Sequence, residues 1–159
     1  MSNYDRNYNR GSNRSPNNHG GPKMAFPEIA EILNQPTKLT WFTDDNKQEL
    51  RRDVLGKEAE GRAIALHNVK KTQIRRFYAP VVALRQRLQA DDKISDIEIQ
   101  AQMQFMRASA AYAGAREQPI ELVQFMSDAA NSVATRRDFD AFARHFECVV
   151  AYHRVFCDK

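Results

Sequence analysis

The sequence predicts an all-α protein, a compact bundle of five to six helices behind a disordered N-terminal tail. Apolar residues recur at spacings of three and four over several successive stretches, which is the period of one helix face. No stretch alternates apolar and polar residues over the length of a strand, and no Asn-Gly or Asp-Gly turn joins two apolar runs. The 159 residues, 42% of them hydrophobic and 28% charged, are enough to bury one core.

The composition of residues 1–24 predicts the disordered tail, and the helical pattern of residues 25–159 predicts a single helical-bundle domain. The tail is rich in Asn, Ser, Gly and Arg, so it cannot bury enough apolar surface to offset the entropy lost on ordering. It holds four basic residues and one acidic residue of the 24 and 20 in the whole chain, which leaves 20 basic and 19 acidic residues for the domain. A nucleic-acid surface on the domain must therefore be a local basic stripe.

The first helical stretches are short. Residues 26–34 predict one helix, and Trp41, after a break, is interpreted as an aromatic anchor of the core. Residues 48–67 again have helical composition, but Gly56 and Gly61 interrupt it. One bent helix or two short ones would fit this stretch equally well.

Residues 70–88 predict the central helix, because six apolar side chains fall on one stripe at about 100° per residue. Pro80 lies inside this helix and predicts a bend rather than an end, since the stripe continues unshifted beyond it. Four basic side chains lie on the flanks and back, where they can meet an anionic partner. The stripe comprises Ile74, Phe77, Tyr78, Val81, Leu84 and Leu88, and the basic residues are Lys71, Arg75, Arg76 and Arg87.

Three further helices complete the bundle. Ser95, with Glu98 three residues later, forms a capping box that opens a helix running toward Gly114. Pro119 stands at the first position of the next helix. Thr135 begins the last one, whose near-heptad row of Phe, Val, His and Cys makes it the most hydrophobic helix of the chain.

The last helix also carries two His–Cys pairs, His145 with Cys148 and His153 with Cys157. Each pair shares one helix face, but the two pairs point roughly 130° apart and lie about two turns apart, so they cannot converge on one ion. Packed histidines and inert thiols are therefore expected, with no metal and no cofactor. Without a CxxC motif or disulfide framework, the thiols suit a reducing, cytoplasmic compartment.

Other classes of protein lack support in the sequence. No apolar run approaches the roughly 18 residues of a membrane span, so no membrane association is expected. The paired acidic residues near 91 and 138 are explained by turns and helix starts, and no nucleophile with its base or phosphate-binding glycine loop is present. We therefore expect that the protein is not an enzyme.

Three segments resemble the small helical subunit of type III-A CRISPR effector (Csm) complexes. They are KKTQIRRFY at residues 70–78, AAYAGAR at 110–116 and FECVVAYHR at 146–154, which are similar in order and spacing to the TxQxRKFY-like, LAYxxGR-like and EAxVAYHK-like segments of that family. The resemblance spans roughly residues 50–156. Two departures are Ser109, where a basic residue is usual, and the Asn/Arg-rich tail, which is not part of the family pattern.

The resemblance implies a non-catalytic subunit that stacks along a filament and contacts the guide RNA and target RNA. The implied partners are the other subunits of the effector complex and further copies of this chain, in a stacked filament or a dimer. Phosphate contacts are expected from basic residues on successive helix turns. The candidate RNA-binding residues are Lys70, Lys71, Arg75, Arg76, Arg107, Arg116 and Arg154.

Two other hypotheses stay open at this point. The same basic stripe could belong to a helical protein-interaction module that binds an acidic protein partner, or it could be an ordinary solvated helix face. A small metal-dependent nuclease is the third candidate, which metal analysis of the purified chain would test. Arg116, near a helix end, could also serve only to complement the helix dipole.

Overall fold

The computed structural model describes residues 26–116 and 119–157, and these form seven helices in chain order. Six of the helices have nine or more residues and α2 is a single turn, so the predicted all-α bundle is confirmed. The predicted tail lies outside the described residues. The helices are α1 (Phe26–Asn34), α2 (Arg52–Leu55), α3 (Lys57–Ala65), α4 (Lys71–Ala90), α5 (Asp96–Arg116), α6 (Ile120–Ser132) and α7 (Arg136–Phe156).

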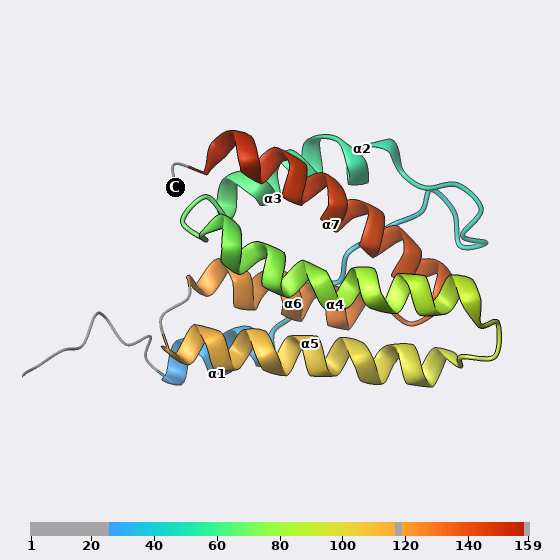
Figure 1. The fold of residues 1–159 in the computed structure, drawn as a ribbon, viewed down its shortest axis with the longest axis horizontal. Helices are drawn as coiled ribbons and strands as arrows, with labels where there is room; N and C mark the ends of the chain where they lie inside the picture. Colours follow the sequence, from blue (N-terminus) through green and yellow to red (C-terminus); the bar gives the residue numbers. More distant parts are fainter. Residues whose placement is uncertain (1–25, 117–118, 158–159) are drawn as a thin grey trace, which may run out of the picture.

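The long helices α4 and α5 run antiparallel, joined by the turn at residues 91–95 (Figure 1). Helix α7 packs on α3 and α4, α5 packs mainly on α6, and α1 covers part of α6 and α5. Direct contacts between α4 and α5 are comparatively few, although the two helices are consecutive. This loose pairing leaves a groove along one face of the bundle.

Aromatic rings from α6 and α7 fill the centre of the core. Phe125, Phe142 and Phe146 are fully buried, and the ring centroids of Phe125 and Phe146 lie 4.9 Å apart in an edge-to-face arrangement. The ring centroids of Trp41 and Phe142 lie 6.1 Å apart, and the Trp41 indole N–H donates to the Ser132 carbonyl at 3.3 Å. The interpretation of Trp41 as a core anchor is therefore confirmed.

The helix boundaries follow the sequence closely, with a few refinements. The first helix has the predicted bounds, and residues 48–67 form two short helices that meet at Gly56. Helix α4 continues through Pro80. The segment before α2 adds one isolated antiparallel bridge between Phe42 and Leu50, which the sequence did not indicate.

The start of α7 is fixed by polar contacts to distant parts of the chain. Thr135 and Asp138 form a reciprocal capping box, and Asp138 also pairs with Lys47 at 3.0 Å. The Arg136 guanidinium donates hydrogen bonds to three backbone carbonyls at and beyond the end of α4, at 2.6 to 3.1 Å. These contacts hold α7 against the α4–α5 turn.

Candidate nucleic-acid interface

The first turns of α4 carry the strongest predicted basic cluster. Its apolar face is buried, with Ile74 1% and Phe77 7% exposed, so the helix is held rigidly against the bundle. Lys70, Arg75 and Arg76 are exposed on the other side, and no ion pair joins any of them to a residue that the structure describes. Their charges therefore face solvent without a counter-ion among the described residues.

The end of α7 brings Arg154 to the same end of the bundle. The Nε2 atom of His153 donates to the carbonyl of Leu66 at 3.1 Å and to that of Val69 at 2.8 Å. Val69 immediately precedes Lys70, so Arg154, the residue after His153, is placed near the start of α4. Arg154 is exposed. Two helices far apart in the sequence thus contribute cations at the same end of the bundle (Figure 1).

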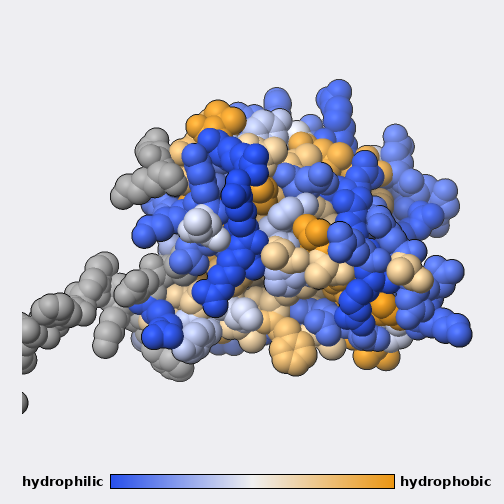
Figure 2. Space-filling model, viewed as in Figure 1, coloured by the Kyte–Doolittle hydropathy of each residue, from blue (hydrophilic) through white to orange (hydrophobic). Residues whose placement is uncertain are grey.

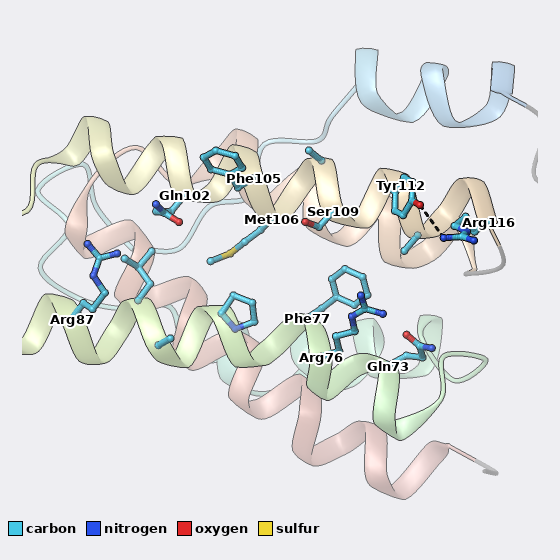
Figure 3. Close-up of a pocket in the computed structure, with 15 residues that line it drawn as sticks. Gln73, Arg76, Phe77, Arg87, Gln102, Phe105, Met106, Ser109, Tyr112 and Arg116 are labelled. Atoms are coloured by element: carbon cyan, nitrogen blue, oxygen red, sulfur yellow. Dashed lines mark hydrogen bonds between the residues drawn. The ribbon is translucent and has the colours of Figure 1, made fainter.

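The end of α5 contributes a third element. Arg116 and Arg76 both line the groove between α4 and α5, which has a volume of about 940 Å³ (Figure 3). The Arg116 guanidinium donates to the Tyr112 hydroxyl at 2.9 Å and lies 5.5 Å from the centre of that ring. Six predicted residues therefore gather at one end of the molecule, and we call them the basic end: Lys70, Lys71, Arg75, Arg76, Arg116 and Arg154.

Arg107 lies apart from the basic end. Its guanidinium donates to the Leu33 carbonyl at 2.7 Å and to the Ser127 hydroxyl at 3.5 Å, so it links α5 to the end of α1 and to α6. The side chain is half-buried. The sequence could not separate Arg107 from Arg116, because both stand in a single helical segment and the partners of Arg107, Leu33 and Ser127, lie in other parts of the chain.

Sequence reasoning missed the groove itself. Phe105 is 69% and Tyr112 is 65% exposed, and both line the groove with Arg87 at its far end. The signal was present as two aromatic residues seven positions apart on α5, which places them on one side of the helix two turns apart. These rings remain exposed because α4 lies apart from α5, and the sequence alone does not reveal that separation.

The buried titratable groups of the core have structural partners. His145 Nδ1 donates to the Val54 carbonyl, and burial lowers the pKa of this imidazole, which keeps it neutral. Burial and the neighbouring Glu147 raise the pKa of the Cys148 thiol and that of Tyr78, whose ring packs edge-on against Phe146. His145 and His153 are 4% and 0% exposed, so the expectation that these two histidines are packed in the core is confirmed.

Buried acidic groups are likewise engaged within the fold. Asp128 accepts hydrogen bonds from the Thr37 amide at 2.8 Å and the Gln124 side chain at 2.7 Å, and its other oxygen lies 3.4 Å from Arg62. Within residues 26–116 and 119–157, no group of three His, Cys, Asp or Glu could hold a metal ion. No helix among these residues is long and apolar enough to cross a membrane.

These features define an all-α protein whose described surface carries a basic end. A family model described as Csm2 Type III-A matches residues 49–159, so the chain belongs to that family. It is therefore the small helical, non-catalytic subunit of the type III-A Csm interference complex, which carries a crRNA. No curated protein and no solved structure gives a match to this chain.

Proposed function

We propose that the protein binds the sugar-phosphate backbone of guide and target RNA through its basic end while copies of it stack along the effector filament. The observation that carries this proposal is the gathering of solvent-facing cations from α4, α5 and α7 at one end of a rigid bundle. A row of such charges suits a repeating anionic chain and requires no contact with base edges. This matches a subunit that must accept any guide sequence.

Arg75 and Arg76 are the central residues of this proposal. Both follow Lys71 on the first turns of α4. Because the buried face of α4 fixes the helix, binding RNA would order only the side chains and not the backbone. Arg107 remains a candidate too, but its bonds to Leu33 and Ser127 would compete with a phosphate.

Stacking of copies and contacts with other Csm subunits would use further surface. Ile64 and Val155 are apolar side chains that are 47% and 74% exposed on α3 and α7. Such residues are suited to contacts between protein subunits. We also propose a cytoplasmic location, which is a reducing compartment that suits the thiols of Cys148 and Cys157.

The test is a double substitution of Arg75 and Arg76 to Ala, measured by RNA affinity at constant salt. A matched control is Arg52→Ala with Lys57→Ala, because both residues are exposed and the variant loses the same charge on α2 and α3. We expect at least a tenfold loss of affinity for the first variant and less than a threefold loss for the control, with unchanged helical content. Equal losses in both variants would show that only net charge matters.

Purification of the assembled complex from its host distinguishes this function from an acidic-partner module. Guide RNA and the backbone subunits should be released when Arg75 and Arg76 are replaced. Retention of an acidic protein without RNA would favour the alternative.

A further inference from the structure

The groove between α4 and α5 differs in chemistry from the basic end that it adjoins. Its floor is formed by apolar side chains such as Phe77, Leu84 and Met106, and its rims carry Arg76, Arg87 and Arg116 (Figure 3). Among the residues that the structure describes, no acidic residue lines it. On this face of the molecule, hydrophobic side chains interrupt an otherwise hydrophilic surface (Figure 2). A ligand that matches the groove must be anionic and must also offer flat apolar area.

Two aromatic rings along α5 are exposed at this groove. Phe105 makes no ring contact with any residue that the structure describes, whereas the rings of the core pair extensively. Tyr112 likewise has no ring–ring contact among the described residues, and the Arg116 guanidinium lies beside it. The seven-residue spacing places the two rings roughly 10 Å apart along the helix axis. Most of the Phe105 side chain, which is 69% exposed, is therefore available to a planar ligand.

The cations are placed to hold phosphates beside these rings. Arg76 has no ion-pair partner among the described residues, and Arg116 is bound only to Tyr112. Arg87 differs, because Glu98 pairs with it at 3.0 Å at the far end of the groove. The positive potential is thus strongest at the end shared by Arg76 and Arg116, where Tyr112 also lies.

We propose that this groove binds a single-stranded segment of RNA, with bases stacked on Phe105 and Tyr112 and phosphates against Arg76 and Arg116. Aromatic platforms combined with a basic track are the general means of holding unpaired nucleic acid without reading its sequence. This inference rests on the proposed function and adds to it. Paired regions would contact the basic end through phosphates alone, whereas unpaired bases would enter the groove.

Charge argues against another occupant from the same chain. Residues 1–24 carry four basic residues and one acidic residue, so they would be repelled by a groove that is itself lined by three arginines. An acidic amphipathic helix of another protein would fit the charge. It would leave the exposed ring faces without the planar partner that they favour.

The experiment compares single-stranded oligouridine with a blunt RNA duplex of equal length, using the full chain. The variant replaces Phe105 and Tyr112 with Ala, and the control is Ile97→Ala, since Ile97 is exposed on the same helix but does not line the groove. We expect a loss of at least tenfold for the single strand and less than twofold for the duplex. A 2-aminopurine base in the strand should be quenched by the wild-type protein and less by the variant.

Other outcomes separate the two proposals. If the Phe105 and Tyr112 variant binds the single strand as the wild type does, the groove proposal is wrong. If binding is still weakened when Arg75 and Arg76 are replaced, the proposed function stands. Equal losses for strand and duplex overturn the stacking role. If the Phe105 and Tyr112 variant still binds RNA but no longer co-purifies with partner subunits, the groove is a protein-docking surface and the RNA proposal for it is wrong. Binding of neither probe by the wild-type chain contradicts the proposed function, and the groove proposal with it.

Discussion

Replacing Gly114 with Ala tests how tightly α5 approaches α6, which fixes one wall of the groove. A Cβ atom at this position would overlap with the Val123 Cγ2 atom, and Val123 is only 1% exposed. Helix propensity favours Ala over Gly by about 1 kcal/mol, whereas overpacking of a core costs about 1–3 kcal/mol. The net expectation is destabilisation by about 1 kcal/mol.

Gly61 provides the matched control. It also lies inside a helix, α3, but a Cβ atom there meets nothing within 4 Å. Gly61→Ala should therefore stabilise the protein by about 1 kcal/mol, so the two variants should differ by about 2 kcal/mol. For a domain of this size that difference separates their Tm values by roughly 4–8 °C.

Thermal melting followed by circular dichroism measures this difference directly. Adding Val123→Ala to the Gly114→Ala variant removes the overlapping methyl group, so the double variant should lose less stability than the two single variants together. If Gly114→Ala stabilises the protein as much as Gly61→Ala does, the result contradicts the close approach of α5 to α6 at Gly114.

The remaining predictions concern stability and its dependence on pH. Because burial holds the pKa of His145 below its value of 6.5 in an unfolded chain, its contribution is complete above pH 6.5 and falls as the pH drops further. Urea unfolding at pH 7.5 and 5.5 should show this loss, and His145→Gln should reduce it. Asp128→Ala leaves the Thr37 amide without its acceptor and should cost about 2–4 kcal/mol in the same assay, with an unchanged fold by circular dichroism. Since one core cluster joins α2 to α7, denaturation should follow a single transition at all wavelengths, and two transitions would contradict a single domain.

Local signals in the sequence were sufficient for most of the fold. The apolar stripe of α4 depends on residues three or four positions apart, and the start of α7 at Thr135 is marked by a local capping residue. Both predictions were confirmed. Lys47 shows where such reasoning fails. It adopts a left-handed backbone conformation, with φ at 54°, and reaches Asp138 from 91 positions away. Nothing near Lys47 in the sequence indicates that partner.

The candidate site likewise has a part that the sequence predicts and a part that depends on how the helices pack. The cations of the first turns of α4 could be predicted to be exposed, because they lie opposite a strong apolar stripe. Their gathering with Arg116 and Arg154 depends on how α5 and α7 pack. The exposure of Phe105 depends on the gap between α4 and α5, which no local pattern encodes.

The salt dependence of RNA affinity tests the central claim most directly. If Arg75 and Arg76 each neutralise one phosphate, replacing both should lower the slope of log affinity against log salt by about 1.4–1.8. The Arg52 and Lys57 control should keep the wild-type slope. An unchanged slope in the Arg75 and Arg76 variant would contradict phosphate binding at the basic end.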